Sequence, residues 1–233
     1  MEGLSAEEIL IWGIKNFHPR LALSASFGAP EGMVLLDMMH RIEPASRVFV
    51  LDTGRLHPAT HDLIDHVRDR YDVEVEVALP RGSDLERMLR EKGMNSFYES
   101  VENRKLCCRI RKVEPMRRYA SKLDAYVSGL RRDQNLNRQH TPKVELDVAS
   151  GGLVKLNPLA DWTREQVMDY VDEHGVPTNR LHKEGFPSVG CQPCSRAVRP
   201  GQPERSGRWW WEEEGDQECG LHLPDEQEGG SGI

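Results

Sequence analysis

The 233-residue chain lacks the features that mark membrane and secreted proteins. It contains no apolar run of membrane-spanning length, and its first residues, "MEGLSAEEILIWGIKNF", carry acids where a signal peptide carries basic side chains. It contains no repeats, and low-complexity sequence is confined to the C-terminal "EQEGGSGI", which we expect to be disordered. These absences predict a cytoplasmic protein rather than a membrane protein, and the length allows one sizeable core plus a smaller appendage.

Positive charge is missing from the C-terminal end. No Lys or Arg follows Arg208, whereas residues 212–233 contain eight acids. Because the net charge is −7, residues 1–211 are close to neutral. The stretch 104–118 has seven Lys or Arg against Glu114 alone, which is typical of a solvated helix face or of an anion site. The negative charge of the whole chain argues against a nucleic-acid partner.

Cysteine is scarce. A cytoplasmic protein keeps its thiols reduced, so the few cysteines do not indicate a disulfide framework. In "KLCCRIRK" (105–112) two thiols are adjacent, and a disulfide between them would close a strained ring. Their partners are therefore expected elsewhere in the chain, which has five cysteines in all: Cys107, Cys108, Cys191, Cys194 and Cys219.

The first half of the chain alternates helix and strand patterns. Ser5 and Glu8 form a predicted capping box for a helix that reaches about Phe17. This alternation predicts an α/β fold with a parallel sheet covered by helices on both faces. Apolar strands are expected at 20–26, 47–52, 73–79 and 125–130, and helices at 33–42, 59–71 and about 109–122.

The chain changes character after about residue 150. The stretch "DWTREQVMDYVDEHG" is predicted to be a helix that begins at a capping box of Thr163 and Gln166 and ends at Gly175. It is followed by an irregular region rich in Pro, Gly and Cys, and then by the acidic tail. The second part of the chain is therefore expected to add a cysteine-bearing region to the sheet.

Two predicted strands end in small polar loops. Ser24, Ser26 and Gly28 follow the first strand and offer hydroxyls and backbone amides that suit a phosphate. Asp52 and Thr53 follow the second strand. Such patterns are common by chance, but open parallel sheets bind ligands at the carboxyl ends of their strands. Their position at two strand ends therefore indicates a ligand site.

The paired cysteines indicate a metal centre. The loop "CQPC" (191–194) places two thiolates on one side of a turn, and Cys107 and Cys108 supply two more. Four thiolates suit tetrahedral zinc or an iron–sulfur cluster. Adjacent ligands are awkward for a single tetrahedral ion, whereas a cubane spreads its ligands over different irons. This favours a 4Fe–4S cluster, with zinc as the alternative.

The fifth cysteine, Cys219, lies in the acidic sequence "DQECGLH". Neighbouring carboxylates raise the pKa of a thiol, so Cys219 can act as a nucleophile only when it docks against positive side chains. Arg205, Arg208 and Lys112 are candidates for that role, and the tryptophans at 209–211 are expected to anchor the tail on the body. The alternative is a surface thiol in a frayed terminus.

Several motifs together resemble one family. The sequences "CC", "GCQPC", "GRWWWE" and "ECGLH" are similar to those of the assimilatory adenylyl-sulfate reductases, and "SASFG", "LDTG", "SGLRRDQ" and "NPLADW" match further landmarks of that family. The resemblance covers roughly residues 20–222. It implies an adenine nucleotide α-hydrolase-like fold. It also implies reduction of adenosine 5′-phosphosulfate (APS) to sulfite and AMP, with thioredoxin as electron donor, in sulfate assimilation toward cysteine.

The resemblance also implies roles for individual residues. Cys219 would attack the sulfur of APS and become an S-sulfocysteine, from which thioredoxin releases sulfite. One 4Fe–4S cluster would be held by Cys107, Cys108, Cys191 and Cys194. The sulfate would be surrounded by Lys112, Arg205, Arg208 and His222. The nucleotide would be held by Ser24, Ser26, Gly28, Asp52, Thr53 and Arg131. The chain would then divide into a nucleotide-binding α/β domain with the cluster site (1–200) and a tail with the catalytic cysteine (201–233).

Other functions stay open at this point. A sister group of the family uses the 3′-phosphorylated substrate (PAPS) and usually lacks the four cluster cysteines, so their presence here favours APS. A tRNA-thiolating enzyme of the same fold would carry an Asp-Ser pair that "SASFGAPEG" lacks. A cluster-bearing redox sensor without enzymatic activity is the third alternative. We expect no membrane partner, and the sequence leaves a homo-oligomer open.

Overall fold

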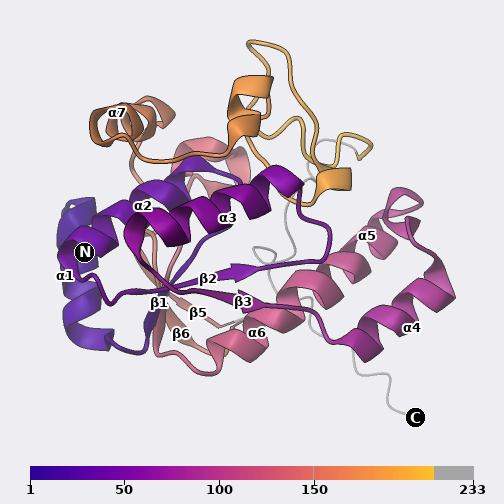
Figure 1. Cartoon of the computed structure of the whole chain (residues 1–233), viewed down its shortest axis with the longest axis horizontal. Helices are drawn as coiled ribbons and strands as arrows, with labels where there is room; N and C mark the ends of the chain where they lie inside the picture. Colours follow the sequence, from indigo (N-terminus) through magenta and orange to yellow (C-terminus); the bar gives the residue numbers. More distant parts are fainter. Residues whose placement is uncertain (149, 213–233) are drawn as a thin grey trace.

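The computed structural model of the chain describes residues 1–148 and 150–212, so Cys219 and His222 lie outside the described residues. Its centre is a six-stranded sheet with the strand order β3-β2-β1-β4-β6-β5 (Figure 1). All neighbouring strands are parallel except β5 and β6, which are antiparallel. The strands are β1 (Leu21–Ser24), β2 (Arg47–Leu51), β3 (Val75–Ala78), β4 (Ala125–Val127), β5 (Val144–Asp147) and β6 (Leu153–Leu156).

Both faces of the sheet are buried, as the apolar strands predict. Side chains of successive strand residues point to opposite faces, so Leu21 and Leu23 join one core cluster, while Ala22 joins the other. The first cluster is covered by α1 (Ala6–Phe17), α2 (Pro30–Ile42), α3 (Pro58–Tyr71) and α7 (Arg164–His174), and the second by α6 (Glu114–Ala120) (Figure 1). The predicted fold class, a largely parallel sheet between helices, is confirmed.

Local capping explains where two of these helices begin. The Ser5 hydroxyl accepts a hydrogen bond from the amide of Glu8, and the Glu8 carboxylate accepts one from the amide of Ser5. Thr163 and Gln166 make the same reciprocal pair before α7, which ends at Gly175 in the left-handed conformation. These are the predicted capping boxes, and they satisfy amides that the first helical turn leaves without partners.

The predicted basic helix is longer than expected and has an irregular centre. It consists of α5 (Val101–Cys108), a π-helical turn (Arg109–Val113) and α6. The amide of Glu114 bonds to the carbonyl of Arg109, five residues earlier, and Pro115 has no amide with which to continue the α-helical pattern. The π-helical turn follows Cys108 directly and contains Lys112.

Three elements were not predicted from the sequence: α4 (Gly82–Lys92), β5 and β6. The two additional strands extend the predicted parallel sheet at one edge, where β5 runs antiparallel to β6. Residues 204–212 are buried or half-buried, with Trp209 only 1% exposed, so this part of the chain packs on the body. The predicted division at residue 200 stays a prediction. Within the described ranges, no helix is long and apolar enough to cross a bilayer.

Candidate active site

A cavity of about 190 Å³ opens where the strand order reverses. β1 has β2 on one side and β4 on the other, and in open α/β sheets such a switch point is where ligands bind. Ser24, at the end of β1, and Ser128 and Gly129, directly after β4, line the cavity. The strand ends therefore place the site where the sequence predicts it.

The loop between β1 and α2 forms one wall of the cavity. Ser26 lines it, and its hydroxyl accepts a weak hydrogen bond of 3.4 Å from the amide of Gly28. Phe27 is buried and takes a positive φ of 54°, which gives the loop its tight turn. A Cβ on Gly28 would lie 2.1 Å from the carbonyl oxygen of Val189, so only glycine permits this close approach to the cysteine-bearing region.

Positive side chains line the cavity from two directions. Lys112 comes from the π-helical turn, and Arg205 and Arg208 come from the C-terminal segment. The Nε of Arg208 donates a hydrogen bond of 3.1 Å to the carbonyl of Cys194. Its guanidinium lies against Gly190, where a Cβ would come within 2.2 Å. Arg138 lines the cavity as well, so the cavity combines strand-end hydroxyls with four cations, an arrangement that suits an anionic group on a nucleotide.

A second pocket, next to the cavity, is lined by all four paired cysteines: Cys107, Cys108, Cys191 and Cys194. Among the described residues, no disulfide joins these four thiols. Lys112 lines both this thiol pocket and the cavity, so the two sites share a wall. In Figure 1 the orange segment that follows α7 runs toward the end of α5, which brings the two cysteine pairs together.

The thiol pocket is both buried and cationic. Burial raises the pKa of Cys194 to about 12, and the neighbouring Cys191 adds to the shift. Burial also raises the pKa of the Cys107 thiol, although the positive charge of Arg111 opposes the shift. Arg55, Arg104 and Arg111 line the pocket. Thiols with raised pKa values are poor ligands until a positively charged metal centre favours their deprotonation.

The residues of the thiol pocket fit a metal–sulfur group. The Nε of Arg111 is buried and has no hydrogen-bond partner within the part of the chain that the structure describes, so it is available to an anionic group. In the same described part, no three His, Cys, Asp or Glu side chains converge tightly enough to hold one metal ion. The four thiols line one pocket, but in the described part of the chain they do not converge on a single position as the ligands of one metal ion would.

Comparison with known proteins assigns the chain to a family. Residues 20–197 match the phosphoadenosine phosphosulfate reductase domain. The chain is 44% identical over 216 residues to an adenosine 5′-phosphosulfate reductase from Burkholderia cepacia, covering 93% of this chain and 86% of that protein. A protein of the same name from Rhizobium tropici is 48% identical over 176 residues, covering 76% and 97%. The chain belongs to this reductase family.

Solved structures agree with the family assignment. A phosphoadenylyl-sulfate reductase from Candida auris, in complex with phosphate, has a TM-score of 0.70 and 32% identity, covering 84% of this chain and 91% of that one. An FMN adenylyltransferase from Candida glabrata has a TM-score of 0.56 at 16% identity, covering 92% and 72%, and shares the fold alone. The resemblance stated from the sequence motifs is thus confirmed, as is the enzyme class.

The structure brings many of the predicted site residues of this reductase together. Those that line the cavity are Ser24, Ser26, Lys112, Arg205 and Arg208. Thr53 lies at the thiol pocket instead, with its Oγ1 3.2 Å from the sulfur of Cys191. Asp52 accepts hydrogen bonds from the amide of Gly54 at 2.8 Å and from His61 at 3.1 Å. The substrate contacts of Asp52, Thr53 and Gly28 stay predictions.

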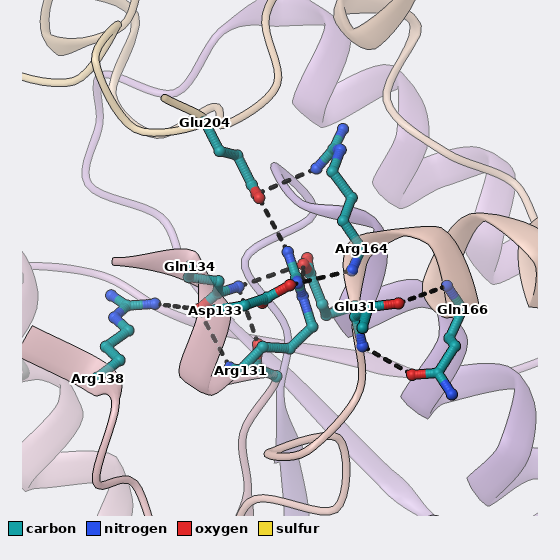
Figure 2. Close-up of polar contacts among 10 residues, drawn as sticks. Glu31, Arg131, Asp133, Gln134, Arg138, Arg164, Gln166 and Glu204 are labelled. Atoms are coloured by element: carbon teal, nitrogen blue, oxygen red, sulfur yellow. Dashed lines mark hydrogen bonds and ion pairs between the residues drawn. The ribbon is translucent and has the colours of Figure 1, made fainter. Parts of the chain in front are cut away.

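Arg131, predicted to hold the nucleotide, occupies a different environment. It is fully buried, and among the described residues it is not one of the side chains that line the cavity. Its guanidinium forms ion pairs with Glu31, Asp133 and Glu204 (Figure 2). A direct contact between Arg131 and the nucleotide stays a prediction.

Sequence reasoning missed several side chains of the cavity. Ser128 follows β4 as Ser24 follows β1, so the same strand-end argument would have found it. Glu31 and Glu204 carried no such signal, because a lone acid in a helix or loop is usually a surface residue. The cavity residues that were missed include Glu31, Ser128, Gln134, Arg138, Ser188 and Glu204.

Proposed function

We propose that the chain reduces APS to sulfite and AMP in assimilatory sulfate reduction, with thioredoxin as electron donor. The observation that carries the proposal is the wall shared by the two pockets. Lys112 lines both the cavity and the thiol pocket, and Arg205 and Arg208 line the cavity with it. The relatives from Burkholderia cepacia and Rhizobium tropici, both named adenosine 5′-phosphosulfate reductase, support the same substrate.

Binding of the substrate follows from the chemistry of the cavity walls. The hydroxyls of Ser24 and Ser26 and the loop amides before α2 are donors for a phosphate. The cations of Lys112, Arg205 and Arg208 would neutralise the oxygens of the phosphosulfate. An incoming thiolate is also anionic, so these cations serve both the substrate and the nucleophile.

The proposed reaction has two thiol steps. The Cys219 thiolate attacks the sulfur of APS, a new S–S bond forms, the S–O bond to the phosphate breaks, and AMP leaves with the electron pair. A thioredoxin thiolate then attacks the Cys219 sulfur, and sulfite departs. The second thioredoxin thiol resolves the mixed disulfide, which returns Cys219 and leaves oxidised thioredoxin. Cys219 must therefore be accessible to the substrate in the first step and to the reductant in the second.

The thiol pocket is proposed to hold a 4Fe–4S cluster through Cys107, Cys108, Cys191 and Cys194. Thiols spread around one space suit a multi-iron group better than a single zinc ion, and Arg104 and Arg111 would balance its negative charge. When bound, the cluster would contribute structure and electrostatics rather than electrons, because thiols provide the reducing equivalents.

The first experiment offers APS and PAPS in parallel to the anaerobically purified protein after added thiols are removed. Peptide mass spectrometry then looks for one added SO3 on the peptide that contains Cys219. A gain with APS alone supports the proposed nucleophile and substrate, and a gain with both indicates dual specificity. If the cluster is intact and neither substrate adds mass, the proposed mechanism is wrong.

A further inference from the structure

The segment that supplies Arg205 and Arg208 depends on side-chain anchors for its position. Residues 199–207 form turns and irregular chain before the isolated bridge at Arg208. The C-terminal end of the segment is fixed by its backbone, since the amide of Arg196 donates to the carbonyl of Gly207 at 3.0 Å. Its N-terminal end is held in the same way, since the amide of Val198 donates to the carbonyl of Gly185 at 2.9 Å. The stretch between these ends is connected to the α/β body through the side chain of Glu204, one residue before Arg205.

Glu204 is held by two arginines from different elements (Figure 2). Its Oε2 pairs with the Nη2 of Arg131 at 2.9 Å, and its Oε1 pairs with the Nη1 of Arg164 at 3.1 Å. Arg131 follows β4, and Arg164 is the first residue of α7. The Glu204 side chain is only 15% exposed, so these pairs lie largely out of water, where charge interactions are strong.

Arg131 is itself fixed on all sides. Its Nε pairs with Glu31 at 2.7 Å, and its Nη1 pairs with Asp133. Asp133 also accepts a hydrogen bond of 3.2 Å from the backbone amide of Arg164. With each of its three nitrogens engaged by a carboxylate, the Arg131 guanidinium is a rigid planar fork. It is therefore suited to hold a protein segment in place.

We propose that Arg131 is a positioning residue that, together with Arg164, binds the carboxylate of Glu204. These ion pairs would hold Arg205 and Arg208 over the cavity. This role rests on the proposed function in one respect, namely that Arg205 and Arg208 bind the phosphosulfate. The proposed role explains why the ion pairs of Arg131 lie beside the cavity rather than in the sheet core. Two of its partners, Glu31 and Glu204, also line the cavity.

Amide hydrogen exchange of the ligand-free holoprotein tests the anchor directly. Glu204→Gln keeps the shape of the side chain but removes its charge, and we expect peptides covering 199–208 to exchange about tenfold faster, with β1 and α7 unchanged. Glu184→Gln is the matched control, since Glu184 is an exposed acid and loses the same charge. Unchanged exchange in Glu204→Gln would overturn the proposal, whatever the enzyme's substrate.

Binding measurements test whether the contacts of Glu204 act on substrate binding through Arg205 and Arg208. In a Cys219→Ser background, which prevents turnover, Glu204→Gln should weaken APS binding about tenfold while adenosine binding stays within about twofold. In a protein that already carries Arg205→Ala and Arg208→Ala, adding Glu204→Gln should weaken APS binding almost no further. An additive loss, or an equal loss of adenosine, would contradict the proposal. If the parent protein does not bind APS, the proposed function fails, and hydrogen exchange alone decides the anchor.

Arg131→Lys provides a second variant on the other side of the pair. An ammonium group keeps the charge but cannot engage three carboxylates in one plane. We expect it to speed exchange in 199–208 and to raise KM for APS, with kcat changed less. Exchange and KM equal to those of the parent protein would show that the fork geometry is not needed, and the proposed role would be wrong.

Discussion

The α/β body and the cysteine-bearing region of this reductase are stabilised by different means. In the body, β1, β2 and β4 bury apolar side chains on both faces of the sheet, and helices cover them. In residues 185–212, regular structure is reduced to one short 3-10 turn and two isolated bridges. There the cysteines pack with Phe97 and Trp209, and backbone hydrogen bonds and buried charge pairs add further contacts.

From this difference we expect the α/β body to determine the stability of the fold and the cysteine-bearing region to determine the chemistry. A hydrophobic core of this kind tolerates a lost polar contact, because many apolar side chains share the burial. The cysteine-bearing region carries two of the four pocket thiols, Cys191 and Cys194, and the cavity cations Arg205 and Arg208, so changes there should affect activity before they affect the sheet. The comparison can be tested by substitutions in each region, taken from the largest expected effect to the smallest.

Removal of the proposed nucleophile should have the largest effect on activity. Cys219→Ser replaces a thiol by a much weaker nucleophile, so we expect sulfite formation to fall by at least about a thousandfold. The brown absorbance expected of the proposed cluster and the midpoint of urea unfolding should stay as in the parent protein. Sulfite release is measured with APS and reduced thioredoxin. A Cys219→Ser protein that still turns over would rule out the S-sulfocysteine step.

Loss of one pocket thiol should remove cluster and activity together. Cys191→Ser leaves three thiols in the pocket, and we expect both the brown absorbance and sulfite formation to be lost. Iron, zinc and sulfide analysis of the purified protein distinguishes a 4Fe–4S cluster from zinc. Cys219→Ser is the matched control, because it removes a thiol but no proposed ligand. Full cluster content in Cys191→Ser would show that the ligand set is wrong.

The pair between Arg104 and Glu212 tests how the cysteine-bearing region is stabilised. The guanidinium donates to both carboxylate oxygens, at 2.9 and 2.8 Å, and the two side chains are 1% and 2% exposed. Glu212→Gln leaves a buried charge without its carboxylate, so we expect the free energy of unfolding to fall by roughly 3 kcal/mol. Urea unfolding measures the loss, with the exposed Glu184→Gln as control. An unchanged midpoint would mean that packing alone holds this region.

Much of the body could be predicted from the sequence because its structure depends on local patterns. The capping boxes at Ser5 and Thr163 and the apolar strands at 20–26 and 47–52 are signals within a few residues. The edge strand β5 was missed for a physical reason. Leu146 is 67% exposed, so its apolar side chain does not mark a buried face.

The site was predictable only in part. Strand ends and cysteine spacing are visible in the sequence, and they correctly indicated the cavity serines and the grouping of the four thiols. The partners of Arg131 are not visible, because Glu31 lies 100 residues before it and Glu204 lies 73 residues after it. Neither separation follows from helix or strand periodicity. Only the fold shows that the three side chains meet.

A buried polar contact in the body should affect stability without affecting chemistry. Asp37 accepts hydrogen bonds from Tyr71 at 3.0 Å and from Tyr170 at 2.8 Å, which joins α2 to α3 and α7. Asp37→Asn weakens these bonds and the ion pair with Arg41, so we expect a loss of about 1–3 kcal/mol in the free energy of unfolding. The kcat/KM for APS should stay unchanged below the unfolding temperature. A loss of kcat/KM in the folded variant would show that the two regions are coupled.

The smallest effect is expected at a partly exposed pair on the sheet. Glu76 on β3 accepts hydrogen bonds from Arg47 on β2, at 2.8 and 3.1 Å. Burial alone would raise the pKa of Glu76, but the hydrogen-bonded guanidinium outweighs it, and the pKa is lowered below the usual value of 4.5. A carboxylate with a lowered pKa in the folded state stabilises the fold above its unfolded pKa, and this stabilisation is lost as the pH falls through the folded pKa.

Glu76→Gln should therefore destabilise the body near pH 7 by less than about 1 kcal/mol, because both side chains are nearly one-third exposed and water screens their attraction. The difference in unfolding free energy from the parent protein should shrink as the pH falls below 4.5, where Glu76 becomes protonated in both states. Urea unfolding at a series of pH values measures it. A difference that stays constant down to low pH would mean that the shape of the Glu76 side chain, rather than its charge, stabilises this edge of the sheet.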